Sequence, residues 1–245
     1  MKYKVFCYAE NVTSESADIY IYGDIVADAG DKWSHDDVCP SDMARILTEC
    51  KDCKTLNIYI NSGGGSVFAG NAIYNQLTNH PAKKTVHIDG LAASIASVIA
   101  LAGDEIYMPS NAFMMVHKPW SLVAGNAPEL RDMADWLDKI EKTLVSVYLD
   151  NANDEATEDS ILALMEAETW LSASEAAELF PAKIKIVDAV DVAACISDMK
   201  YKHMPAALVR PTPGTDDEAK KAEAIQLKNK IAMNENFLFM EDLKK

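Results

Sequence analysis

The sequence lacks any apolar run long enough to cross a membrane. A spanning helix needs about 20 mostly apolar residues, whereas the longest such stretch in this chain, residues 91–103, is shorter and contains Ser94 and Ser97. The first residues, Met-Lys-Tyr-Lys-Val-Phe, lack the apolar core and the small-residue cleavage site of a secretion signal. We therefore expect a cytoplasmic protein with no membrane partner.

Basic residues are also few. Lysine and arginine together number 23 against 38 aspartates and glutamates, so the formal net charge is −15 at pH 7. Nucleic-acid phosphates would be repelled by this charge, and no stripe of Lys and Arg offsets the repulsion. Nucleic acid is therefore excluded as a partner, and the acidity is assigned to solubility.

Cysteine is scarce and its spacing is irregular. The five cysteines stand at positions 7, 39, 50, 53 and 195, an odd number with no disulfide framework, so reduced thiols are expected. Cys50-Lys-Asp-Cys53 has the spacing of half a zinc site or of a redox pair. A closed zinc site needs four ligands, and no second Cys/His pair lies nearby. The pair is therefore interpreted as two thiols at a helix end, and no metal is expected.

The one glycine-rich turn lacks the lysine of a phosphate-binding loop. Residues 61–66 read Asn-Ser-Gly-Gly-Gly-Ser, and Val67 follows where a nucleotide-binding loop would continue with Gly-Lys-Ser/Thr. Nucleotide binding is therefore not expected, and no cofactor is assigned. Glycines at such a turn let backbone N–H groups approach a reacting atom. The turn is interpreted as an oxyanion donor, with a purely structural turn as the alternative.

Hydrophobic periodicity predicts strands alternating with helices. Alternating or short apolar runs predict strands, and apolar residues three or four positions apart predict helices. This order is typical of parallel βαβ units, so an α/β fold is expected. The predicted strands are 18–25, 56–60, 86–88, 106–108 and 113–116; the predicted helices are 41–50 (capped by Ser41), 67–77, 92–102, 129–149, 158–165 and 174–179.

The composition changes near residue 200. Residues 200–215 contain three prolines and a glycine without a periodic apolar face, which is typical of a linker. Residues 216–245 are charged and helix-prone. The sequence thus predicts one domain over 1–199, a proline-containing linker over 200–215 and a helical tail over 216–245.

Two polar residues stand where catalysis is often found. Ser94 lies at the predicted start of a small-residue helix that follows a strand, a common place for a nucleophile. Ser97 is the competing candidate one turn further on. His117 ends a hydrophobic strand. Taken singly, the serine is more often a packing residue and the histidine a structural one; their conjunction makes them candidates.

Three motifs together resemble the Clp protease proteolytic subunit family. They stand in the family's order and spacing, and the similarity extends from about residue 19 to 191. The motifs are Tyr-Ile-Asn-Ser-Gly-Gly-Gly at 59–65, Gly-Leu-Ala-Ala-Ser-Ile at 90–95 and Met-Val-His-Lys-Pro at 115–119.

The resemblance implies a ClpP/crotonase-like fold of repeated ββα units and a serine endopeptidase that hydrolyses peptide bonds. By position, Ser94 matches the family nucleophile and His117 its general base, and the backbone N–H groups of Gly65 and Ile95 match the oxyanion hole. Glu168 takes the position of the family's aspartate. Ala167 replaces the arginine that precedes this aspartate in the family.

Finer features are similar to the Clp-related peptidases of tailed phages and prophages, which process capsid or scaffold proteins during head maturation. These features are Glu-Thr-Trp at 168–170, the Ser-Gly-Gly-Gly turn at 62–65 and Gly-Leu-Ala-Ala-Ser-Ile-Ala-Ser at 90–97, and the C-terminal extension fits the same lineage. The resemblance implies polypeptide substrates, a homo-oligomeric ring and a capsid or scaffold partner. Docking of an ATPase unfoldase is left open, because the residues before Asp18 do not match the family's axial loop.

Two other functions remain as alternatives. The crotonase group of acyl-CoA enzymes shares the fold and an oxyanion hole, but it needs no Ser/His pair. A catalytically silent ring or scaffold subunit is the other alternative, because Glu168 departs from the family's aspartate. Glu166, Asp89 and Asp104 are the next candidates for the triad acid.

Overall fold

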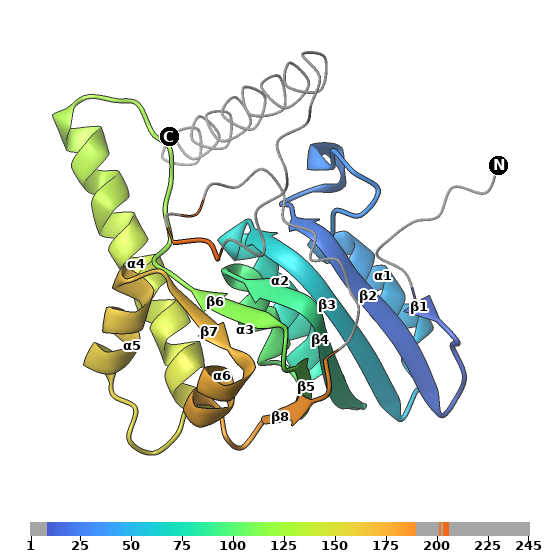
Figure 1. The fold of residues 1–245 in the computed structure, drawn as a ribbon. Helices are drawn as coiled ribbons and strands as arrows, with labels where there is room; N and C mark the ends of the chain where they lie inside the picture. Colours follow the sequence, from blue (N-terminus) through green and yellow to red (C-terminus); the bar gives the residue numbers. More distant parts are fainter. Residues whose placement is uncertain (1–8, 190–200, 202, 206–245) are drawn as a thin grey trace, which may run out of the picture.

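The computed structural model describes residues 9–189, 201 and 203–205 (Figure 1). The predicted tail at 216–245 and most of the predicted linker at 200–215 lie outside these residues, as do Cys7 and Cys195. In the described part of the chain, no helix is both long and apolar enough to cross a membrane.

A mixed β-sheet forms the centre of the molecule. Its strands run in the order β1-β2-β3-β4-β5-β8; β2, β3, β4, β5 and β8 pair in parallel, and the short β1 pairs antiparallel with β2. Residue bounds are β1 Ala9–Glu10, β2 Ser16–Ile25, β3 Thr55–Gly65, β4 Lys83–Ala93, β5 Glu105–Pro109 and β8 Ile184–Val187.

β4 is shared between two pairings, and this geometry builds the site. Its first half pairs with β5, whereas its last residues, Leu91 to Ala93, pair in parallel with β6 (Phe113–Val116). A further strand, β7 (Thr169–Ser172), then pairs antiparallel with β6. The end of β4 therefore carries its own small extension of the sheet.

Six α-helices of residues 9–189 lie around the sheet. α1, α2 and α3 pack on one another or on the central strands, and α4, α5 and α6 lie together beside β6 and β7 (Figure 1). A short 3₁₀ turn spans Ala29–Asp31. Residue bounds are α1 Pro40–Glu49, α2 Val67–Asn79, α3 Ile95–Ala100, α4 Ala127–Asn151, α5 Glu158–Glu166 and α6 Ala173–Leu179.

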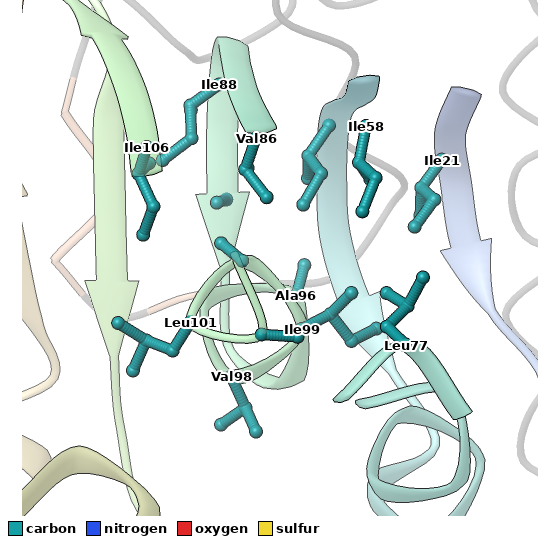
Figure 2. Close-up of a cluster of buried hydrophobic side chains, with 14 of the residues drawn as sticks. Ile21, Ile58, Leu77, Val86, Ile88, Ala96, Val98, Ile99, Leu101 and Ile106 are labelled. Atoms are coloured by element: carbon teal, nitrogen blue, oxygen red, sulfur yellow. The ribbon is translucent and has the colours of Figure 1, made fainter. Parts of the chain in front are cut away.

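The core lies between the central strands and α3. Alternate residues are buried in the first half of β2, β3 and β4, as the two-residue period of a strand dictates, and every residue of α3 is buried. Figure 2 shows side chains from the strands, such as Ile58 and Val86, facing Ala96 and Ile99 of α3 and Leu77 at the end of α2. A helix that is apolar on all sides is stable only in such a buried position.

The α/β fold class predicted from the sequence is confirmed, because helices connect the parallel strands of the central sheet. Two local predictions are wrong. The first helix is not capped by Ser41, because Pro40 occupies its first turn and Cys39 is the N-cap residue. The helix expected at 92–102 begins only at Ile95, because β4 continues through Ala93 to pair with β6.

Candidate active site

Ser94 occupies a strained junction between β4 and α3. It is the single residue that separates the two elements, and its backbone has φ +55° and ψ −129°. A positive φ is uncommon for a residue other than glycine and costs on the order of 1–2 kcal/mol. The Ser94 N–H donates a 2.9 Å hydrogen bond to the carbonyl of Met115 on β6, which ties this conformation to the neighbouring strand.

The pairing of β4 with β6 also brings His117 to Ser94. Ala93 lies opposite Met115 in this pairing. Ser94, which follows Ala93, and His117, which is two residues beyond Met115, therefore lie at the same edge of the sheet. The Ser94 hydroxyl lies 2.8 Å from Nε2 of His117. In this geometry the hydroxyl donates to a neutral imidazole, and the ring is positioned to accept the proton.

His117 is electrostatically suited to remain neutral. Burial lowers the pKa of its imidazole, and the nearby carboxylate of Glu168 offsets part of that decrease. Because the net pKa is below the ordinary value, the ring is unprotonated at neutral pH. A neutral ring is the form that accepts a proton from a serine hydroxyl.

The glycine turn at the end of β3 contacts the nucleophile. Gly64 has φ +96°, and a Cβ atom there would lie 2.7 Å from the Ser94 Cβ and 3.3 Å from the backbone nitrogen of Ile95. Gly65 has φ +144°, and its Cβ would lie 2.1 Å from the carbonyl oxygen of Ile25. Only glycine fits both positions, because each combines a positive φ with a close backbone approach.

Ser62 holds the turn in place. Its hydroxyl donates to the Gly23 carbonyl at 2.5 Å and accepts from the Gly64 N–H at 3.1 Å. The turn therefore lies beside Ile95, the first residue of α3, whose N–H has no partner within its helix. Gly64 and Ile95 thus lie next to Ser94, and Gly65 follows Gly64 in the same turn.

Glu168 lies opposite His117 without a hydrogen bond to it. β7 runs antiparallel to β6 with Thr169 opposite Val116. Glu168, which precedes Thr169, therefore faces His117, which follows Val116. Among the described contacts, the Glu168 carboxylate accepts a 2.7 Å hydrogen bond from the backbone N–H of His203, and none joins it to the His117 ring. Its backbone has φ +50°, a second strained non-glycine residue at the site.

Ser97, the competing nucleophile, points away from His117. It is completely buried, donates a 2.6 Å hydrogen bond to the Ser94 carbonyl and pairs with the Tyr148 hydroxyl at 2.8 Å. Burial raises the pKa of Tyr148 to about 12, so this hydroxyl stays neutral. Ser97 and Tyr148 thus support the backbone of the nucleophile. Tyr148 was missed from the sequence because it lies 51 positions away on α4.

The other candidate acids are engaged elsewhere. Glu166 forms a 2.5 Å ion pair with Lys118, Asp89 accepts a hydrogen bond from Tyr22, and Asp104 accepts one from the Lys84 N–H at 2.7 Å.

The Cys50/Cys53 pair is buried and consists of free thiols. Burial and the neighbouring Cys53 raise the pKa of Cys50 to about 11. The Cys53 thiol donates to the Thr13 carbonyl at 3.0 Å. A protonated, buried thiol is unreactive and is a poor metal ligand. Within residues 9–189, 201 and 203–205, no group of three metal-ligating side chains gathers.

Comparison with known proteins agrees with this geometry. The Clp protease family model matches residues 31–179, which is more than half of the chain. An ATP-dependent Clp protease proteolytic subunit from Bacteroides thetaiotaomicron is 32% identical over 127 residues, 51% of this chain and 57% of the relative. A Ligilactobacillus salivarius protein of the same name is 30% identical over 148 residues, 59% of this chain and 74% of the relative.

A solved structure of similar fold is a ClpP1 mutant from Listeria monocytogenes. It superimposes with a TM-score of 0.57 at 22% identity and covers 70% of this chain and 91% of its own. The matched region spans less than two thirds of the length of the first curated relatives. The family match and the shared fold together show that this chain belongs to the Clp protease family.

Proposed function

We propose that the protein is a serine endopeptidase that hydrolyses peptide bonds of polypeptide substrates. The observation that carries this proposal is the 2.8 Å contact between the Ser94 hydroxyl and Nε2 of a partly buried His117. Three further features support it: the strained backbone of Ser94, the adjoining glycine turn and membership of the Clp protease family.

The proposed chemistry is acyl transfer to a serine. The Ser94 oxygen attacks the carbonyl carbon of the substrate while Nε2 of His117 takes the hydroxyl proton. The backbone N–H groups of Gly65 and Ile95 stabilise the oxyanion, and a donor of this kind contributes about 3–4 kcal/mol to the transition state. His117 then gives its proton to the leaving amine, and a water activated by the same ring hydrolyses the acyl-enzyme.

Glu168 serves in this proposal as the third member of the triad. Its carboxylate stabilises the imidazolium that forms when His117 takes the proton, consistent with its effect on the pKa of that ring. It orients the ring once the carboxylate turns from the His203 N–H to Nδ1. The present partner of Glu168 also favours a second candidate function, a catalytically silent ring or scaffold subunit.

A fluorophosphonate probe separates the two functions, because it reacts with an activated serine and needs no known substrate. We expect labelling of the full chain at Ser94, located by mass spectrometry. Ser94→Ala should abolish labelling, and His117→Ala should reduce it to background. Ser121→Ala, which removes an exposed hydroxyl, is the control and should label like the wild type. Absence of labelling at every pH tested, both in wild type and in His203→Pro, which lacks the N–H bound to Glu168, would favour the silent subunit.

The substrates we propose are capsid or scaffold proteins in phage or prophage head maturation. The support is the resemblance at 62–65 and 168–170 described above. We place this reaction in the cytoplasm, a compartment compatible with the adjacent free thiols of Cys50 and Cys53. Incubation of the protein with the capsid and scaffold proteins encoded beside it, followed by mass spectrometry, would identify cleavage. Products that also form with Ser94→Ala would refute the assignment.

We also propose a homo-oligomeric ring. Phe68 of α2 is 60% exposed, Trp136 of α4 is 36% exposed, and the two flank a cavity of about 400 Å³ between these helices. Exposed aromatic residues around an apolar cavity are typical of an association surface.

Ring stacking is a separate point. Because Ala167 replaces the family's arginine, a single ring is expected rather than a stacked pair. Analytical ultracentrifugation tests this, and a monomer at all concentrations would refute the ring.

The domain plan of the sequence analysis stays a proposal. It places one peptidase domain over 1–199, a linker over 200–215 and a helical tail over 216–245. Limited proteolysis followed by mass spectrometry should cut first within 206–215, because an exposed linker is the preferred site of cleavage. Earliest cleavage inside 9–189 would contradict this boundary.

A further inference from the structure

Four described residues lie beyond position 189, and the first three of them contact the candidate active site or the cluster beside it. We call them the return segment: Tyr201, His203, Met204 and Pro205. The Tyr201 hydroxyl donates a hydrogen bond to the carbonyl of Gly63 in the glycine turn. The Tyr201 ring meets the His117 ring edge-on, with ring centroids 5.6 Å apart and planes at 79°.

A pocket built from the site holds the Tyr201 ring. On its other side the ring meets Trp170 of β7 edge-on at 5.4 Å. Beneath it lies a small apolar cluster of Leu91, Ala93 and Met115, against which Tyr201 and Met204 both pack. Burial, together with the carboxylates of Asp24 and Glu168, raises the pKa of the Tyr201 phenol well above its ordinary value. The phenol is therefore a neutral donor.

His203 binds the carboxylate of Glu168, the proposed third member of the triad. Its backbone N–H donates to Oε1 of Glu168 at 2.7 Å, and its ring nitrogen Nδ1 lies 3.0 Å from the Ala167 carbonyl. A backbone N–H bound to a carboxylate is a charge-assisted contact, stronger than one between neutral groups. This bond holds the carboxylate toward the return segment, and among the described residues no hydrogen bond joins it to the His117 ring.

These contacts converge on groups that the proposed reaction needs. Gly63 lies in the turn that borders the oxyanion site, His117 is the base, and Glu168 is the acid. One short piece of chain meets all three with a side-chain hydroxyl, an aromatic ring and a backbone amide. Extended peptides make the same kinds of contact with a peptide-binding groove, namely main-chain hydrogen bonds and pockets for alternate side chains.

We propose that the return segment is an internal peptide ligand of the active site, that it marks a subsite for an aromatic side chain between Gly63 and Trp170, and that it restrains activity until displaced. This inference rests on the proposed peptidase function. It assigns to the site a substrate class, polypeptides with tyrosine or phenylalanine beside the scissile region. Because the segment belongs to the same chain, it competes with substrate at a high effective concentration.

The test uses the full chain and the rate of fluorophosphonate labelling at Ser94. His203→Pro removes the N–H that Glu168 accepts, whereas His203→Ala keeps that N–H and loses only the contact of the ring with Ala167. We expect His203→Pro to label about 10-fold faster than wild type or more. The variant loses the charge-assisted bond to Glu168 that helps to hold the return segment on the site. His203→Ala, the matched control, should stay closer to wild type.

Tyr201 is tested in the same way. Tyr201→Ala empties the aromatic subsite, and we expect labelling to rise about 10-fold or more. Tyr201→Phe keeps the ring and loses only the bond to Gly63, so a smaller rise is expected. If Tyr201→Ala does not fold, the labelling rate of Tyr201→Phe shows whether Tyr201 restrains the site.

A peptide added in trans tests occupancy of the subsite directly. The peptide Met-Lys-Tyr-Lys-His-Met-Pro-Ala has the sequence of residues 199–206. It should slow labelling of Tyr201→Ala or His203→Pro, and the same peptide with alanine in place of tyrosine should have little effect.

The outcomes distinguish this inference from the proposed function. Equal labelling rates in wild type and all return-segment variants, or no effect of the peptide, would overturn the inference and leave the peptidase function in place. No labelling in wild type and in every variant would overturn both. Faster labelling of His203→Pro than of His203→Ala, with inhibition by the tyrosine peptide, is the result we expect.

Discussion

Replacing Gly64 with alanine should remove activity by displacing the nucleophile. The new Cβ would lie 2.7 Å from the Ser94 Cβ, 2.7 Å from the Ala93 carbonyl oxygen and 3.3 Å from the Ile95 nitrogen. Contacts below 3.0 Å between such atoms are not tolerated, so the turn and the start of α3 must move apart. The backbone of Gly64 also has φ +96°, which alanine adopts only under strain.

The magnitude follows from these two effects. A positive φ at alanine costs about 1–2 kcal/mol, and overpacking adds about 1–3 kcal/mol. Together they lower the free energy of unfolding by roughly 2–5 kcal/mol, or the melting temperature by roughly 5–15 °C for a domain of this size. The turn also carries the proposed oxyanion donor Gly65, so loss of its alignment should lower kcat about 100- to 1,000-fold.

Thermal unfolding and Ser94 labelling, both on the full chain, check the two effects separately. Gly30→Ala is the matched control, since its Cβ would meet only Oδ1 of Asp28 at an ordinary 3.6 Å. We expect Gly30→Ala to behave like wild type in both assays. A Gly64→Ala protein that labels and unfolds like the Gly30→Ala control would refute the close approach of the turn to Ser94.

Three further predictions concern groups around the nucleophile. Ser97→Ala should keep Ser94 labelling but lose about 1–3 kcal/mol of stability, because the buried Tyr148 hydroxyl loses its Ser97 partner. A double variant with Tyr148→Phe should lose less stability. Denaturant unfolding measures the stability of both variants. Hydrolysis needs neutral His117, whose pKa lies below its ordinary value, so activity should fall as pH drops through a midpoint below about 6.5 in a kcat/KM profile; a midpoint above 7 would contradict this. Glu168→Gln removes the charge that raises the pKa of His117, so it should lower the maximal rate and shift that midpoint to lower pH, whereas an unchanged profile would remove Glu168 from the triad.

Periodicity predicted the elements that carry their own local pattern. The helix predicted at 129–149 is α4, Ala127–Asn151, and the strand predicted at 113–116 is β6 with the same bounds. These elements were visible because apolar residues recur every three or four positions along α4, and because β6 is a short continuous apolar run, Phe-Met-Met-Val. The Ser94–His117 contact could likewise be expected from the order of the motifs, and the structure places the two side chains 2.8 Å apart.

Three other short strands could not be predicted in this way. β1 has 2 residues, and β7 and β8 have 4 each without the continuous apolar run Phe-Met-Met-Val that marks β6. Their strand character comes from pairing with β2, β6 and β5, which are distant in the sequence. The continuation of β4 through Ala93 has the same origin, because alanines at a strand end also favour a helix.

Local pattern and motif order were enough to predict the α/β class, the family and the candidate Ser94–His117 pair. The hydrogen-bond partners of the polar groups around this pair depend instead on contacts between distant segments. The register of β7 against β6 sets Glu168 opposite His117, and the return segment supplies the amide that Glu168 accepts. Ser97 turns to Tyr148 because α4 packs against α3. These contacts join residues 35 and 51 positions apart, and no local propensity encodes such distances.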